Sequence, residues 1–203
     1  MMQNPKLRLG FLASKNGSSM RVILDAIARN ELPAEARVVI SNNRNAPALD
    51  FAAAAGVATT WIPTKHDPQS ADLALTEAMV DAGVNLVVLS GYLRRLGPIF
   101  LERFRGRVLN IHPGPLPAFG GEGMYGRRVH EAVIAQGLGQ SAAVIHLVDG
   151  EYDHGPEIAR LELPLTPNET AESLEARLTA LEPGFYLRTL QEIARGERLL
   201  PAG

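Results

Sequence analysis

Short apolar runs alternate with helix-forming segments through the first half of the chain, and this alternation constrains the fold most. The runs predicted to be strands lie at residues 6–13, 36–41, 57–62, 86–90 and 106–112. Amphipathic or alanine-rich segments between them predict helices that end near residues 29, 55, 83 and 104. Strands that alternate with helices form a mostly parallel sheet, and the continuous apolar run at 86–90 indicates that helices cover both faces.

The pattern changes after about residue 140. Residues 142–148 and 157–163 predict two strands with no helix between them, which favours an antiparallel extension of the sheet. A long helical segment follows from about residue 170 to 195, and Pro183-Gly184 should kink or break it. We therefore expect a single α/β domain over residues 1–203, with helices on both faces of the sheet.

Composition excludes several classes of function. The chain has 203 residues, a formal net charge of −2 and no cysteine. Without cysteine there is no thiolate catalysis and no zinc–thiolate site. The charge gives no overall attraction to nucleic acid or to an anionic membrane. We find no apolar run of transmembrane length and no signal-peptide core, and we expect a cytoplasmic protein.

The segment that joins the first predicted strand to the first helix contains Gly17, Ser18 and Ser19. Amide groups at a helix N-terminus bind phosphate, and glycine lets the backbone approach an anion closely. The segment matches neither the dinucleotide-binding nor the Walker A pattern. Phosphate binding and a simple capped helix start both remain open.

Asn110 and His112 end the predicted strand at 106–112, immediately before Pro113. Side chains two residues apart on a strand share a face, so these two point the same way. An amide donor beside an imidazole suits a developing oxyanion, and the carboxyl ends of parallel strands form the ligand crevice of such sheets. The competing interpretation is a strand end whose polar groups are simply satisfied.

Asp153 lies in the turn-like segment 149–156, where it could orient and charge the His112 imidazole or belong to a solvated acidic turn. A metal site is conceivable from His146, Glu151, Asp153 and His154. The spacing of these residues matches no recognised metal-ligand pattern. His146 is expected to be packed or hydrogen-bonded on its strand. His130, on a predicted helix, is expected to face solvent.

The segment 91–96 leaves the fourth predicted strand at the same edge of the sheet. It contains Leu93, Arg94, Arg95 and Leu96. Its backbone and apolar side chains could line a flat pocket for a ring system. A helix start with two exposed arginines is the alternative, and the pattern does not choose between them.

Taken together, Asn110-Ile111-His112-Pro113, the downstream Asp153-His154-Gly155-Pro156 and the Asn-Gly-Ser loop at 16–18 resemble the phosphoribosylglycinamide formyltransferase family. These are folate-dependent transformylases of purine synthesis. The resemblance implies the formyltransferase fold, with a Rossmann-like sheet and an antiparallel C-terminal extension. It also implies transfer of a formyl group from 10-formyltetrahydrofolate to the amine of glycinamide ribonucleotide, with no metal.

The resemblance also assigns residues. It implies catalytic roles for Asn110, His112 and Asp153, phosphate binding by Gly17, Ser18 and Ser19, and a ribonucleotide contact by Glu182. The implied folate-binding residues are Leu93, Arg94, Arg95, Leu96, Asn110, Val148, Asp149, Gly150, Glu151 and Tyr152. Phosphate and nucleotide binding would fall to about residues 1–105, and catalysis and folate binding to about 106–203. The implied partners are these small molecules, with no nucleic acid or membrane, in a monomer or homodimer.

Some positions depart from the family pattern. Ser19 stands where many members have asparagine, Lys15 where many have glycine and Gly114 where many have serine; Pro183 follows Glu182 in place of the usual histidine. Formyltetrahydrofolate deformylase, which passes the formyl group to water, and methionyl-tRNA formyltransferase are competing enzymes that share the catalytic elements. A non-catalytic phosphate- or nucleotide-binding module is the alternative from another class.

Overall fold

The computed structural model describes residues 6–201 and confirms the α/β class. Its seven strands are β1 (Leu7–Leu12), β2 (Ala34–Ser41), β3 (Ala58–Trp61), β4 (Leu86–Leu89), β5 (Val108–His112), β6 (Gln140–Leu147) and β7 (Glu157–Pro164). The helices of this range are α1 (Ser18–Ala28), α2 (Pro47–Ala54), α3 (Pro68–Asp81), α4 (Pro98–Arg103), α5 (Arg127–Ala135) and α6 (Ala171–Ala194). The predicted strands agree with these bounds to within two residues.

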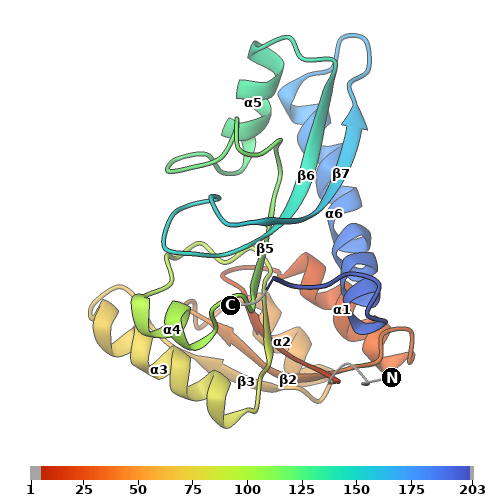
Figure 1. Cartoon of the computed structure of the whole chain (residues 1–203). Coiled ribbons are helices and arrows are strands. Elements are labelled where there is room, and N and C mark those ends of the chain that lie inside the picture. The colour runs from red at the N-terminus through yellow and green to blue at the C-terminus, as the bar shows by residue number, and fades with distance from the viewer. Residues whose placement is uncertain (1–5, 202–203) are drawn as a thin grey trace.

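The seven strands form one sheet in the order β3-β2-β1-β4-β5-β6-β7 (Figure 1). Neighbours from β3 to β5 are parallel, whereas β5–β6 and β6–β7 are antiparallel. The predicted antiparallel extension is therefore confirmed. β1 lies between β2 and β4, because strands are added on one side of β1 up to β3 and on the other side from β4 onward. Ligands of such sheets bind at this topological switch point, at the carboxyl ends of β1 and β4.

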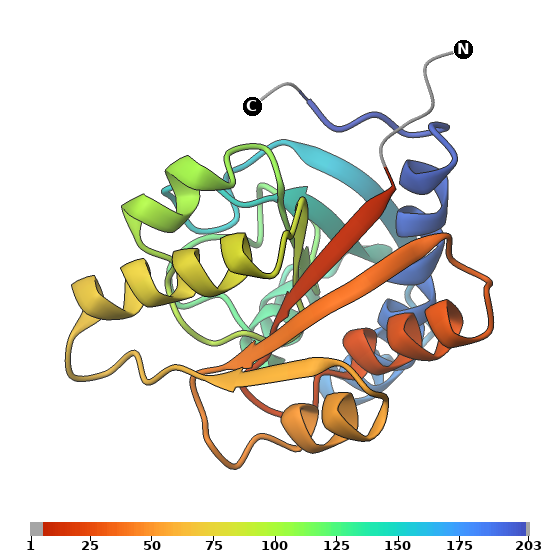
Figure 2. The ribbon, with the colours of Figure 1, turned by 90° about the horizontal axis from the view of Figure 1, so that it is seen from below.

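Two hydrophobic cores lie on opposite faces of the sheet. One is formed with α1, α2, α5 and α6, and it contains residues such as Phe11, Val88 and Tyr186, all fully buried. The other is formed with α3 and α4 around Val87, Met79 and Phe100. Figure 2 shows α3 and α4 on one side of the strands and α1 and α2 on the other. Alternate residues of β4 thus enter different cores, which explains its continuous apolar sequence.

Specific polar groups fix where the helices begin. The carboxylate of Asp67 accepts a hydrogen bond from the Ser70 backbone N–H at 3.0 Å and caps α3, whose first residue is Pro68. α4 is capped from another helix, because the buried Asp72 of α3 accepts from the N–H groups of Ile99 and Phe100 at 2.9 and 3.0 Å. This contact sets the position of α4 and of the loop before it.

The loops that follow β1 and β4 are joined directly. Ser14 donates its backbone N–H to the Gly91 carbonyl at 3.1 Å, and its hydroxyl accepts from the Leu93 N–H at 2.8 Å. The Ser90 hydroxyl accepts from the Met20 N–H at the start of α1 at 3.0 Å. The two loops therefore form one rim at the carboxyl end of the sheet.

The sequence predicts a kink or a break at Pro183-Gly184, and the break is wrong. α6 is continuous from Ala171 to Ala194 with Pro183 inside it. Proline removes one backbone hydrogen bond and costs a helix about 3 kcal/mol. Here α6 packs against α1, α5 and the sheet, with Leu174 and Leu178 buried before the proline and Tyr186 and Leu190 after it. Burial of apolar side chains before and after Pro183 outweighs the local cost of the proline. A sequence pattern alone does not reveal this burial.

Candidate active site

A cleft of about 710 Å³ opens at the carboxyl ends of the parallel strands. It collects residues from the start of α1, from β5 and the loops after β4 and β5, from the start of α5, from the loop between β6 and β7, and from α6. Its lining includes Ser18, Ser19, Leu93, Arg94, Asn110, His112, Tyr152, Asp153 and Glu182. Leu93, Tyr152 and Tyr125 present large apolar surfaces there with exposed fractions of 54%, 49% and 61%. Such exposed apolar surface beside polar groups is typical of a ligand site.

β5 carries Asn110 and His112 to the floor of this cleft. The His112 ring is 3% exposed, and its Nδ1 lies 3.3 Å from an Asp153 carboxylate oxygen. Asp153 comes from the β6–β7 loop with a left-handed φ of 55°, a conformation that aspartate tolerates better than most side chains. The structure therefore brings together the three side chains that the sequence pattern singled out.

His146 is a fourth member of this cluster that sequence reasoning did not assign to the site. It lies opposite Asn110 in the antiparallel β5–β6 pair. Its Nε2 is 3.2 Å from the Asn110 amide nitrogen and 3.4 Å from the second Asp153 oxygen, while its Nδ1 is 2.8 Å from the Leu147 carbonyl. The expectation that His146 is packed and hydrogen-bonded is confirmed. Only the strand register, which the sequence does not give, reveals its contacts with Asn110 and Asp153.

The surroundings of Asp153 favour its charged form. Burial alone would raise the pKa of this carboxyl, but hydrogen bonds from His112 and His146, the charge of His112 and the Gly121 N–H at 3.2 Å outweigh it. The net effect holds the pKa of Asp153 well below its ordinary value. A carboxylate is thus available beside two imidazoles.

The second nitrogen of His112 also faces an acceptor. Its Nε2 is 2.7 Å from the Phe119 carbonyl, in the loop that follows β5. Two acceptors satisfy both N–H groups of an imidazolium. The same loop passes close to the ring at Gly114, where an added Cβ would lie 2.4 Å from Val129 and 3.3 Å from His112 Nε2. A glycine at position 114 therefore allows this close approach without moving Val129.

Ser18 and Ser19, the first two residues of α1, reach the cleft. Gly17 adopts φ 61°, ψ 50° immediately before the helix, and a Cβ there would lie 3.2 Å from Ala48. The left-handed conformation favours glycine, and the neighbouring side chains leave little room for a Cβ. Within residues 6–201, the N–H groups of Ser18 and Ser19 donate to no backbone or side-chain acceptor, as is usual in a first helical turn.

Glu182 lines the cleft from α6. Burial raises its pKa to about 7. Arg128 at the start of α5 also lines the cleft and lies over the ring of Tyr125, with its Cζ 5.4 Å from the ring centroid. The cleft therefore holds an acidic side chain that titrates near neutrality and a cation that the sequence did not indicate.

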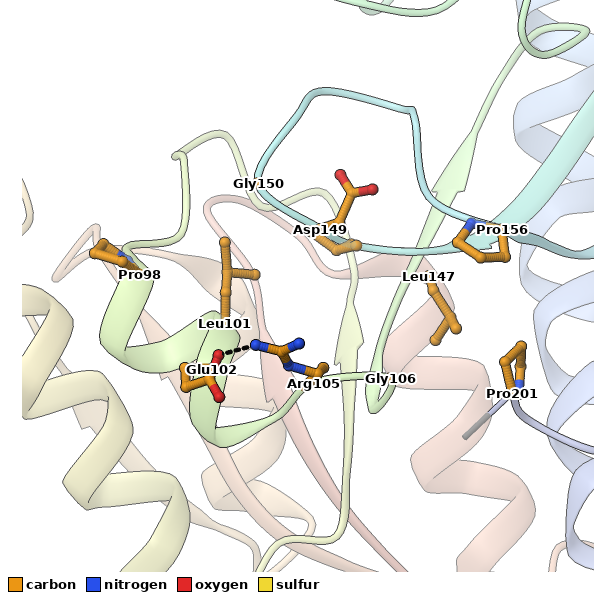
Figure 3. A pocket seen from close by; sticks show the side chains of 11 residues that line it. Pro98, Leu101, Glu102, Arg105, Gly106, Leu147, Asp149, Gly150, Pro156 and Pro201 are labelled. Carbon is orange, nitrogen blue, oxygen red and sulfur yellow. Dashed lines mark hydrogen bonds and ion pairs between the residues drawn. The ribbon is translucent and has the colours of Figure 1, made fainter. Parts of the chain in front are cut away.

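The other predicted folate-binding residues divide among three places. Leu96 is 6% exposed and belongs to the core with α3 and α4, and Glu151 is exposed. Val148, Asp149 and Gly150 line a second cavity of about 550 Å³ beside α4. Figure 3 shows Asp149 and Gly150 on the loop above this cavity, with Pro98 and Leu101 on the other side. Arg95 lines neither space and reaches from its loop to Gly150.

The remaining histidines are outside the cluster. His130 was expected to face solvent, which is wrong, because it is 2% exposed between α5 and its neighbours, and burial lowers its pKa. His154 is exposed and pairs with Asp149 at 3.1 Å, which raises the pKa of His154. Among the described residues, no three histidine, aspartate or glutamate side chains gather as a metal site would require. Nor does any described helix combine the length and apolar composition needed to cross a bilayer.

Comparisons with known proteins place this cleft in a family. The formyl transferase family profile matches residues 7–190. Phosphoribosylglycinamide formyltransferase from Mycobacterium tuberculosis is 38% identical over 189 residues, which cover 92% of this chain and 85% of that protein. The solved structure of the phosphoribosylglycinamide formyltransferase from Coxiella burnetii has a TM-score of 0.86 and 32% identity, over 97% of this chain and 92% of that chain.

The chloroplastic phosphoribosylglycinamide formyltransferases of Vigna unguiculata and Arabidopsis thaliana are longer. They are 33% and 31% identical to this chain, which spans 62% and 65% of their lengths. Matches of this extent, over nearly all of the chain, settle its relationship as well as its fold. The chain belongs to the phosphoribosylglycinamide formyltransferase family.

Proposed function

We propose that the chain transfers a formyl group from 10-formyltetrahydrofolate to the amine of glycinamide ribonucleotide, as part of purine synthesis. The observation that carries the proposal is the meeting of Asn110, His112 and Asp153 in one cleft with the amino end of α1. Anion-binding amides and an oxyanion-stabilising cluster in the same cleft suit a phosphorylated amine acceptor and a carbonyl donor.

In the proposed reaction, the substrate amine attacks the formyl carbon on N10 of the folate, and a tetrahedral intermediate with a negative oxygen forms. Asn110 donates a hydrogen bond to that oxygen, and protonated His112 stabilises it by charge. Asp153 holds the imidazolium in place and relays a proton through water to the departing nitrogen. Because His112 Nε2 faces the Phe119 carbonyl at 2.7 Å, its contribution in this geometry is charge rather than a direct hydrogen bond.

The proposal assigns the binding residues by position. Gly17, Ser18 and Ser19 hold the substrate phosphate, and Glu182 contacts the ribonucleotide from α6. Leu93, Arg94 and Tyr152 contact the folate in the main cleft, and Val148, Asp149 and Gly150 form the far wall of the folate site beside α4. Binding of phosphate would then fall mainly to residues 1–105 and catalysis to 106–203. The cytoplasmic location remains a prediction.

A folate absorbance assay with and without glycinamide ribonucleotide tests this function. We expect release of tetrahydrofolate only when the ribonucleotide is present. Release without the ribonucleotide would identify a deformylase and contradict the transferase. No release under either condition, with phosphoribosyl compounds still bound, would leave a binding module and contradict both enzymes.

A further inference from the structure

Arg95 connects two loops that come from distant parts of the chain. Its Nη2 donates a hydrogen bond to the Gly150 carbonyl at 2.5 Å. Its Cζ lies 5.6 Å from the centroid of the Tyr152 ring, close enough for a cation–π interaction. Arg95 belongs to the loop between β4 and α4, and the other two residues belong to the loop between β6 and β7. One guanidinium therefore fastens the second loop to the first.

This link lies between the two cavities. Tyr152 lines the main cleft together with Leu93, whereas Gly150 lines the second cavity together with Leu101. In Figure 3, Gly150 lies at the edge of its loop nearest to the segment that precedes Pro98. Arg95 thus contacts one lining residue of each space, and the link lies beside the walls that a flat molecule extending from the main cleft into the second cavity would contact.

The second cavity suits the ring end of such a molecule. Its lining is largely apolar, with Pro98, Leu101, Leu147, Val148, Pro156 and Pro201 around it, and Glu102, Arg105 and Asp149 are its charged residues. The reduced bicyclic ring of a folate is flat, and it carries an amino group and ring N–H groups that need acceptors. Gly150 lies on the cavity wall, and its carbonyl already accepts a hydrogen bond from the Arg95 guanidinium, which is itself a planar group with N–H donors.

We propose that Arg95 competes with the folate ring and thereby sets the affinity of the formyl donor. This inference rests on the proposed function. The ring enters the second cavity only when Arg95 releases Gly150, so the apparent affinity is lowered by the fraction of molecules in which the link is closed. Arg95 is exposed, so the link has the modest net strength of a solvent-accessible hydrogen bond and can be displaced by a ligand.

Arg95→Leu removes the link and keeps an aliphatic side chain. Arg103→Leu is a matched control, because Arg103 is also exposed and also stacks on an aromatic ring, with its Cζ 5.3 Å from the Phe104 centroid. Both variants lose one positive charge, so any general effect of charge on an anionic donor appears in both. Isothermal titration with tetrahydrofolate measures donor-site affinity without turnover, and steady-state kinetics give a separate KM for each substrate.

We expect Arg95→Leu to bind tetrahydrofolate about 2- to 12-fold more tightly than wild type and to lower the donor KM by a similar factor. The KM for glycinamide ribonucleotide should stay unchanged, and Arg103→Leu should behave as wild type. Hydrogen exchange at residues 150–153 should quicken only in Arg95→Leu. Unchanged or weaker tetrahydrofolate binding in Arg95→Leu would overturn the proposal, as would an equal gain in Arg103→Leu.

The two proposals fail separately in this experiment. Wild-type protein that binds tetrahydrofolate but transfers no formyl group contradicts the proposed function, and the affinity comparison still decides the role of Arg95. If wild type does not bind and Arg95→Leu does, the competition is supported in its strongest form. If neither binds tetrahydrofolate, both proposals are wrong.

Discussion

Asn110 has a single role in the proposed chemistry, which is to donate a hydrogen bond to the oxyanion. Asn110→Ala removes one oxyanion donor, which typically costs about 3–4 kcal/mol of barrier, or roughly 10²–10³ in rate. We expect kcat to fall by that factor while the KM of the ribonucleotide changes little, in steady-state assays. Asn85→Ala is the control, because Asn85 accepts from the Arg8 N–H at the opposite end of the sheet. Near-native kcat in Asn110→Ala would remove this residue from the mechanism.

His112 and Asp153 should act as a unit, because the imidazole and the carboxylate are 3.3 Å apart. We expect His112→Ala, Asp153→Asn and the double variant to lose similar amounts of kcat, since the second change removes a group that no longer has its partner. A double-mutant cycle measures this. Rate losses that simply multiply would argue against a coupled pair.

Glu182 gives a pH dependence of stability with a defined sign. Its pKa is raised from 4.5 to about 7 by burial, so the folded state keeps a proton that the unfolded state has lost between these values. Stability is therefore lost as pH rises through this window. Relative to wild type, Glu182→Gln should gain about 1–3 kcal/mol of unfolding free energy between pH 4.5 and pH 8. Urea unfolding at both pH values measures the gain, and an equal difference at both would contradict it.

For single residues, the residue type and spacing in the sequence predicted which polar groups reach the cleft, but they did not predict all the contacts of those groups. Asn110 and His112 followed from the period of a strand and its stop at Pro113. His146 was missed as a site residue because its contact with Asn110 depends on the register of β5 against β6. His130 was wrongly placed in solvent because the packing of α5 on α6 decides which face is buried.

Among the elements, α4 depends on a contact from a different helix. Asp72→Ala removes the acceptor for the N–H groups of Ile99 and Phe100, and it leaves the buried Phe100 N–H without a partner. We expect a loss of about 1–3 kcal/mol in unfolding free energy, measured by urea denaturation. Asp72→Asn keeps one acceptor and should lose less. Equal stability in Asp72→Ala and wild type would show that this cap contributes nothing.

Local sequence signals predicted most element ends, because caps are encoded nearby. Asp67-Pro68 begins α3, and Gly83 ends it with a φ of 69°. α6 shows where local signals fail, since its continuity through Pro183 depends on packing along its whole length. The cap of α4 by Asp72 could not be predicted either, because Asp72 lies 27 and 28 residues before the two N–H groups that it accepts from, those of Ile99 and Phe100.

For the whole molecule, the alternation of strands and helices was enough to predict the fold, because only a few arrangements bury the apolar faces of such strands and helices. It could not predict the division of the predicted folate walls between a main cleft and a second cavity. That division depends on the contact between the loops after β4 and β6. Arg95 and Gly150, which form this contact, are 55 residues apart in the chain, so no local sequence signal predicts it.

The destination of the formyl carbon tests the central claim most directly. The donor carries a ¹³C-labelled formyl group, and the products with glycinamide ribonucleotide present are followed by mass spectrometry. We predict one labelled formylglycinamide ribonucleotide for each tetrahydrofolate released, since in the proposed mechanism the cleft holds the acceptor against the cluster of Asn110, His112 and Asp153. Label recovered as formate, in an amount independent of the ribonucleotide, would contradict the account.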